Sequence, residues 1–268
     1  MKNRRSLLIL LIVLFVACSI VVATSIALSA DISIGGGIGL VPDYEGSDDY
    51  ELVPIPFVNV IWENGMFFNL EGLTAKANLI PSNFWRLGLI ANYRPKRSHV
   101  ENDKVDRLEN VEPALEVGPF AGIQYKNWNV SVEVTTDVAE GHDGTLFAVR
   151  SGYNWVTSEN LTILFDASAT YASNDYMASY FSIDLLDSLR SGLPQYHAAG
   201  GFKDINFRLG LAYGITDRWS ARAIASYTRL VGDAEDSPAV DDVGDANQFF
   251  GGFVTIYNFG GNRQANKY

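Results

Sequence analysis

Three histidines are the side chains of this 268-residue sequence best suited to act as general bases, because imidazole titrates near neutral pH. His99 and His142 lie in charged stretches, and we interpret both as solvated loop residues. Near His197 are polar residues that include a hydroxyl nucleophile and a carboxylate: Ser191, Tyr196 and Asp204. A triad is defined by geometry and not by closeness along the chain, and a loop rich in glycine and proline explains the same residues. The sequence therefore predicts no catalytic residue and no enzyme.

Two acidic stretches could attract a hard divalent cation, because such ions prefer carboxylate oxygens. Their members are Asp43, Glu45, Asp48, Asp49 and Glu51 in the first, and Asp233, Glu235, Asp236, Asp241, Asp242 and Asp245 in the second. Neither stretch has the spacing of a calcium-binding loop, so we interpret both as solvated loops. The glycine-rich "GGGIG" at 35–39 opens no helix and lacks a phosphate-loop lysine. We therefore expect no metal site and no cofactor.

Between these loop stretches, the sequence predicts β-strands in which apolar and polar residues alternate. "WRLGLIANYR", Trp85 to Arg94, places apolar side chains on one face and mostly polar ones on the other. Twelve such segments are predicted, at 32–40, 52–62, 66–75, 85–94, 114–126, 128–138, 145–155, 161–171, 176–183, 205–213, 219–227 and 248–259. Tight turns between neighbouring segments predict hairpins and an antiparallel sheet. The best candidate for a short helix is Asp184 to Gly192.

The number of strands has an alternative of ten. If every segment crosses the sheet once, the short turns at 63–65 and 81–83 fall at opposite ends of it. Either one candidate strand is false, or one short turn lies at the end that carries the long loops.

Aromatic residues bracket small aliphatic ones on the apolar faces, which is the pattern of a transmembrane barrel. Tryptophan and tyrosine settle at membrane–water interfaces, and about eight residues of tilted strand cover roughly 20 Å. The predicted aromatic girdle is Trp85, Tyr93, Trp128, Trp155, Tyr171, Tyr213, Trp219 and Tyr227. The opposite faces carry charges that must then point into the lumen, namely Arg86, Glu133, Arg150, Asp166, Arg208 and Arg222. The alternative is a soluble β-sandwich or lipocalin-like barrel, with the apolar faces inward.

The first 29 residues have the layout of a secretory signal peptide. Lys2, Arg4 and Arg5 precede an uncharged apolar run, and small residues follow up to a cleavage site near Ser29 or Ala30. We expect one β-barrel domain over residues 30–268 in the bacterial outer membrane. Loss of the three cations changes the formal net charge from −11 to −14, which disfavours a nucleic-acid partner. Cys18 lies in the apolar run, so no disulfide is expected in the mature chain.

Three segments and the chain end resemble the MipA/OmpV family of outer-membrane β-barrels. They are "YEGS" at 44–47, "SGLPQYHAAGGFKD" at 191–204, "RLVGDAEDSPAV" at 229–240 and the late "YNF" at 257–259. The residues that carry the resemblance are Tyr44, Gly46, Ser47, Ser191, Gly192, Leu193, Pro194, Tyr196, Asp204, Gly232, Asp233, Asp236, Ser237 and Pro238. The chain departs from the pattern by continuing as "GGNRQANKY" after Phe259.

The resemblance implies a non-enzymatic scaffold for peptidoglycan-remodelling enzymes, in which a lytic transglycosylase and a penicillin-binding protein are partners. Outer-membrane lipid is the other expected partner. The lumen charges and acidic loops leave a second function class open, either a small-solute channel or a surface-interaction and adhesion barrel. A barrel of ten or twelve strands has room for a narrow pore only if loops do not plug it.

Overall fold

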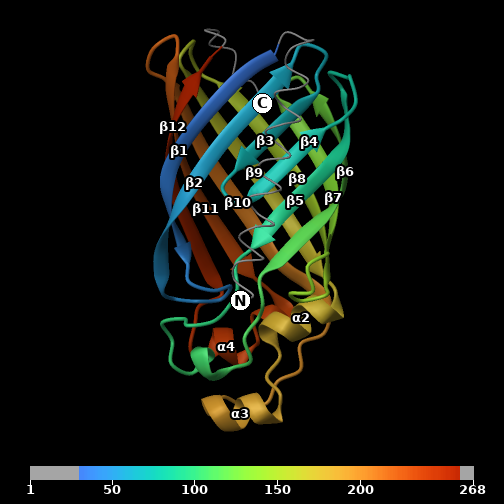
Figure 1. Ribbon diagram of the computed structural model, residues 1–268, viewed down its shortest axis with the longest axis vertical. Coiled ribbons are helices and arrows are strands. Elements are labelled where there is room, and N and C mark those ends of the chain that lie inside the picture. Colours follow the sequence, from blue (N-terminus) through green and yellow to red (C-terminus); the bar gives the residue numbers. More distant parts are fainter. Residues whose placement is uncertain (1–29, 260–268) are drawn as a thin grey trace.

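The computed structural model describes residues 30–259, which form a closed antiparallel barrel of twelve strands (Figure 1). Each strand pairs with its neighbours in sequence, and β12 closes the barrel against β1. The strands are β1 Ala30–Pro42, β2 Tyr50–Trp62, β3 Phe67–Glu71, β4 Thr74–Asn78, β5 Trp85–Arg94, β6 Ala114–Tyr125, β7 Trp128–Asp137, β8 Thr145–Val156, β9 Leu161–Ala172, β10 Gly201–Gly214, β11 Trp219–Leu230 and β12 Asn247–Asn258. The predicted fold is confirmed. The expected signal peptide and the final "GGNRQANKY" lie outside the described residues.

The two ends of the barrel differ in their connections (Figure 1). At one end, here the turn end, the strands are joined by short segments at 63–66, 79–84, 126–127, 157–160 and 215–218. At the other end five longer segments form what we call the loop cap, namely 43–49, 95–113, 138–144, 173–200 and 231–246. The cap contains α2 Asn174–Phe181, α3 Leu185–Ser191, α4 Pro238–Asp241 and the 3-10 turns η1 Val105–Arg107 and η2 Gly232–Ala234.

Two of the predicted strands are wrong, and the errors cancel in the number. Segment 66–75 is not one strand but the hairpin β3–β4, which turns at Gly72 with a φ of +59°. Segment 176–183 lies mostly in α2, where Tyr176, Met177, Tyr180 and Phe181 are buried on one helical face. The short turns at 63–66 and 79–84 therefore lie at the same end of the barrel, because β3 and β4 together go down and back.

The alternation of the sequence becomes the two faces of the wall. On the outer face, large apolar side chains such as Leu89, Val132 and Phe207 are about half exposed. Facing inward from the same strands are polar and charged groups such as Glu133 and Arg208. In-register pairing along each ladder keeps every outward residue beside another outward residue. The soluble alternative is excluded by these exposed apolar faces, since a soluble barrel would bury them.

Glycines in β1 let the wall close. A Cβ on Gly37 would lie 1.9 Å from the carbonyl oxygen of Phe253 on β12. At Gly39 a Cβ would lie within 3.0 Å of the side chains of Ile55 and Phe250. The segment "GGGIG" is therefore a strand, as predicted, and side chains from both neighbouring strands pack over it.

The loop cap has an apolar core of its own. One cluster joins α2 to η2, α4 and the strand ends, and it contains Val111, Leu146, Ala172, Tyr176, Met177, Tyr180, Phe181, Ala198, Leu230, Ala234 and Val240. A second joins four of the loop segments and contains Tyr44, Val105, Leu108, Ile183, Leu193 and Ala239. These side chains are buried, so the cap is packed as the interior of a soluble domain is packed. It closes the barrel at the loop end.

Candidate functional site

Glu45, in the loop between β1 and β2, is the centre of a charge network under the cap. Its carboxylate accepts a hydrogen bond from the Tyr176 hydroxyl at 2.6 Å, contacts Lys203 Nζ and lies 3.8 Å from the guanidinium of Arg94. Burial raises the pKa of Glu45, but the charges of Lys203 and Arg94 outweigh that effect and hold the pKa below its usual value. The prediction that Glu45 is a solvated loop carboxylate is wrong, because the loop folds inward over the lumen.

Lys203 reaches Glu45 through an irregularity in β10. The register between β9 and β10 shifts between Phe202 and Asp204, so Lys203 is an extra residue in the ladder. A bulge of this kind re-aims side chains, and here both Lys203 and Asp204 are buried. The ammonium of Lys203 contacts the Asp204 carboxylate as well as Glu45. One cation thus joins the wall to the cap.

His142 is buried against the same network. Its Nε2 lies 3.1 Å from a carboxylate oxygen of Glu116, which also accepts a hydrogen bond from Arg94 Nε at 2.7 Å. The Gly144 N–H donates to His142 Nδ1 at 3.0 Å, so the neutral ring carries its proton on Nε2 and donates it to Glu116. The prediction of a solvated His142 is wrong. Asp137 accepts four backbone N–H groups of residues 139–143 and folds this loop back over the lumen.

Further from the cap, the buried carboxylate of Glu133 on β7 forms salt bridges with two cations. It lies 2.7 Å from Lys76 Nζ on β4 and 2.9 Å from Arg150 Nε on β8. The carboxylate is buried, whereas the Arg150 side chain is 49% exposed to the interior. The bridge to Lys76 joins β4 to β7, which are not neighbouring strands, and therefore helps to fix the shape of the lumen.

Glu71 does the same on the opposite side of the lumen. Its two oxygens contact Arg208 at 3.2 Å and Arg222 at 2.9 Å. Sequence reasoning misses both Glu71 and Lys76, because it places a single strand over 66–75. The signal that could have found them is the "EGL" turn between them, which splits that segment into two short strands.

The two remaining predicted lumen charges, Arg86 and Asp166, are not members of these ion pairs. Arg86 faces the turn end, where its guanidinium donates to the carbonyl oxygens of Ser82 and Gly65. Asp166 lies on the inner face of β9, directly beside Arg208 in the ladder. The structure thus places one predicted charge at a turn and the other five along the interior.

The network and the lumen pairs together enclose a polar cavity of about 310 Å³. Its lining includes Glu45, Asn92, Arg94, Glu116, Glu133, Arg150, Lys203, Asp204, Asn206 and Arg208. Arg150 and Arg208 are the most exposed of its paired cations. The cavity can bind a small polar solute, but the apolar cap separates it from the loop end.

The residues that carry the family resemblance meet in the loop cap. Tyr44 and Leu193 belong to one apolar cluster, and Ser237 Oγ donates to the Phe181 carbonyl at 2.7 Å. Gly46 has a φ of +100°, and a Cβ there would lie 2.5 Å from Val240. The three segments of the resemblance thus contact one another in the loop cap.

Other members of that set end helices or tie loops together. Gly192 ends α3 in the left-handed conformation, and Pro238 begins α4. Tyr196 donates from its hydroxyl to the carbonyl oxygen of Asp233 at 3.0 Å. Ser237 and Pro238 are buried, so only part of "GDAEDSP" is a solvated loop. Ser47 is buried, and its carbonyl oxygen accepts a hydrogen bond from Gln248. Pro194 and Asp236 are exposed, and Gly232 has a φ of +58°.

The candidate triad near His197 is not assembled. His197 is exposed, whereas Ser191 Oγ donates to the Asp187 carbonyl inside α3. The Asp204 carboxylate forms a salt bridge with Lys203. His99 is exposed in the loop between β5 and β6. Within residues 30–259 no group of three or more metal-ligating side chains is close enough to hold an ion, and no helix there has the length and apolar character to cross a membrane.

The predicted girdle residues lie on the outer face at both ends of the wall. Trp85, Trp128, Trp155, Tyr171, Tyr213 and Trp219 are 40–60% exposed, and Tyr93 and Tyr227 are less so. Rings pair along the wall, as with Trp128 over Tyr153 and Trp219 over Tyr257, with centroids 4.7 Å and 5.0 Å apart. That these rings form the interfacial belt stays a prediction.

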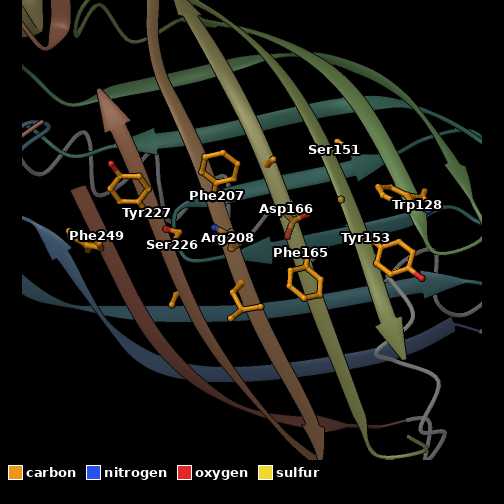
Figure 2. Close-up of a pocket in the computed structure, with 14 residues that line it drawn as sticks. Trp128, Ser151, Tyr153, Phe165, Asp166, Phe207, Arg208, Ser226, Tyr227 and Phe249 are labelled. Carbon is orange, nitrogen blue, oxygen red and sulfur yellow. The ribbon is translucent and has the colours of Figure 1, made fainter. Parts of the chain in front are cut away.

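An apolar groove of about 650 Å³ crosses the outer face of the wall from β7 to β12 (Figure 2). Its rims are rings such as Phe165, Phe207 and Tyr227, and its floor includes the small residues Ser151 and Ala225. Figure 2 shows Phe165, Phe207 and Tyr227 projecting from neighbouring strands. In a membrane such a groove is filled by hydrocarbon chains.

A closed barrel with an exposed apolar outer face and a charged interior is an outer-membrane β-barrel. The model of the MltA-interacting protein MipA family matches residues 34–259. The chain therefore belongs to this family.

Named relatives agree with that assignment. The MltA-interacting protein of Escherichia coli (strain K12) is 24% identical over 233 residues, which cover 84% of this chain and 91% of the relative. The outer membrane protein OmpV of Vibrio cholerae is 30% identical over 162 residues, 59% of each chain. Among solved structures, the NanC porin has a TM-score of 0.43 with 12% identity, and covers 85% of this chain and 99% of its own. The expected outer-membrane localisation is confirmed.

Proposed function

We propose that this chain is a non-conducting, non-enzymatic scaffold of the outer membrane, whose turn end docks a lytic transglycosylase and, with it, a penicillin-binding protein. The observation that carries the proposal is the packed loop cap. Its two apolar clusters cover the lumen, and the network around Glu45 ties them to the wall. A barrel closed in this way serves better as a platform than as a pore.

The turn end is the surface for the partner. In outer-membrane barrels the short turns face the periplasm, where cell-wall enzymes act, and the long loops face outward. The printed name of the Escherichia coli relative states an interaction with MltA. The exposed turn residues here include Glu159 and Arg218, so the docking face is polar and of mixed charge.

The test combines an interaction assay with a conductance assay. Protein purified from outer membranes should retain a lytic transglycosylase of the MltA type and should give no steps in planar bilayers. Glu159→Lys should weaken retention, whereas Asp103→Lys, an exposed charge reversal in the loop cap, should not. Equal retention by both variants would show that the turn end is not the docking face.

The charged cavity favours a second candidate, a small-solute channel. Arg150 and Arg208 expose nearly half of their side chains inside the barrel. A channel requires that the cap open, since its core separates the cavity from the loop end. Conductance steps in wild-type protein, without retention of any cell-wall enzyme, would support the channel and contradict the scaffold.

A further inference from the structure

The barrel wall is incompletely paired between β2 and β5. β3 pairs only with residues 57–61 of β2, and β4 pairs only with residues 88–92 of β5. The hairpin turns at Gly72, whose N–H donates to the Pro56 carbonyl at 2.9 Å. Within residues 30–259, residues 50–55 therefore pair with β1 on one side and with no strand on the other. Figure 1 shows β3 and β4 ending partway along the wall while β2 and β5 continue toward the cap.

The unpaired part of the wall, between residues 50–55 of β2 and the end of β5, is here called the lateral opening. Its width can be given at the hairpin, where it begins. At the hairpin, two strands separate β2 from β5, so their backbones are three spacings of ~4.8 Å, or about 14 Å, apart. Beyond the turn, no backbone pairing among the described strands joins β2 to β5. The opening lies in the half of the wall nearer the loop cap.

The chemistry of the free edge excludes another β-strand as its occupant. Alternate residues point their backbone groups to the same side, so Leu52 and Pro54 direct their carbonyl oxygens into the opening as Pro56 does. Pro54 and Pro56 have no N–H to donate, and proline on an edge blocks strand addition. The edge thus offers acceptors for a partner that donates hydrogen bonds.

The two sides of the opening are unlike. On the membrane side the rim is apolar, with Leu52 70% exposed and Leu73, at the hairpin turn, 44% exposed. Behind it, Thr74 and Asn92 form the near wall of the charged cavity, and Glu45 also lines that cavity. Backbone carbonyls cannot remain unsatisfied in hydrocarbon. The opening therefore requires a polar partner at its edge and an apolar one at its rim.

We propose that this lateral opening binds an amphipathic lipid of the outer leaflet. Its polar head group lies against the carbonyl edge of β2 and the mouth of the charged cavity, and its acyl chain lies along Leu52 and Leu73. The proposal does not depend on the scaffold function. It gives the lumen an exit into the membrane that bypasses the closed cap.

Lipid-borne quenchers test it directly. Val53 points inward from the free edge of β2, so Val53→Cys carries a bimane label that only a lipid entering the opening can reach. Thr228→Cys on β11 is the matched control, because it also faces the cavity but has paired strands on both sides. The vesicles contain phosphatidylcholine and phosphatidylethanolamine, and only the phosphatidylethanolamine, whose ammonium can donate to the carbonyl edge, has brominated acyl chains. We expect about twofold quenching at position 53 and none at position 228, because the paired wall excludes hydrocarbon. Protein without an introduced cysteine is the labelling blank.

A matched pair of rim variants sharpens the result. Leu40 on β1 is the cross-strand partner of Leu52 and also faces outward, but it is paired on both sides. Leu52→Gln should reduce the quenching at position 53, and Leu40→Gln should leave it unchanged. Glu51→Cys supplies a second inward position if Val53→Cys does not fold on heat-modifiability gels. Equal quenching at positions 53 and 228, or quenching at 53 by aqueous iodide alone, would overturn the proposal.

Discussion

The loop end and the turn end of this barrel solve different problems. At the turn end, connections of two to six residues join neighbouring strands, and the strands are held by their pairing in the barrel wall. At the loop end, segments of up to 28 residues bury two apolar clusters and a network of charges. The difference teaches that stability in the wall comes from the ladder and the lipid, whereas the cap has to be stabilised as a small soluble domain is.

A substitution in the charge network around Glu45 should have the largest effect on stability, and it tests whether the cap is held differently from the wall. Glu45→Ala leaves Lys203 and Arg94 without their shared carboxylate, and loss of one partner in a buried ion pair costs about 3–5 kcal/mol. The free energy of unfolding, from the urea midpoint of protein in vesicles, should fall by that amount. Glu235→Ala, which removes the partner of the partly exposed Arg229, should cost under about 1 kcal/mol. Similar losses in both would mean that the cap is not held by this network.

The outer wall gives the next largest effect. Leu89 is 51% exposed on the outer face of β5, so Leu89→Arg places a cation in hydrocarbon and should cost about 2–4 kcal/mol. Leu89→Trp should stay within about 0.5 kcal/mol of wild type, because lipid accepts a larger ring and a packed interior does not. The folded fraction on heat-modifiability gels and the urea midpoint measure both. Loss of folding in both variants would refute the outward assignment of Leu89.

The barrel could be predicted from the sequence because alternation is a local signal that each strand carries by itself. Strand boundaries failed where one turn, at Gly72, is hidden in an apolar run, and where α2 imitates alternation. The lumen charges on well-marked strands, such as Glu133 and Arg222, were accessible to the same reasoning.

The cap could not be predicted in the same way. Glu45 and His142 lie in polar loops whose sequences look solvated, and their burial depends on contacts with residues more than 20 positions away, such as Lys203 and Glu116. The bulge that re-aims Lys203 leaves no mark on the local pattern. Only the family resemblance indicated that these loops are structured, because the residues that carry it make many of the contacts between the loop segments of the cap.

A change of pH should destabilise the loop cap but not the wall, with a smaller effect on stability than the substitutions above. The pKa of Glu45 is lowered in the folded state, so its stabilising contribution is complete above its unfolded value near 4.5 and is lost as the pH falls through the folded value. Burial, and then the charge of Asp48, raises the pKa of Tyr44 to about 12, so stability also falls as the pH rises from 10 toward 12. Proteolysis of the loop segments should therefore increase below pH 4.5 and above pH 10 while the barrel stays heat-modifiable. Cleavage that does not depend on pH would contradict this assignment.

The smallest expected change in stability tests the free edge of β2. Replacing both edge prolines, Pro54→Val with Pro56→Val, restores two N–H donors on the side of β2 where, within residues 30–259, the pairing with β3 ends. Their side chains face outward and are exposed, so the free energy of unfolding should change by no more than about 0.5 kcal/mol.

The same double variant should nevertheless associate, because an edge with both donors and acceptors is a template for another copy of itself. Crosslinking in membranes should show a dimer that the wild type lacks. Pro119→Val is the control: its side chain is also exposed on the outer face, but the added N–H lies within β6, which has β5 and β7 on either side and offers no edge. A monomeric double variant would mean that another part of the chain covers the edge, and a dimer from Pro119→Val would mean that the added valine, not the edge, causes association.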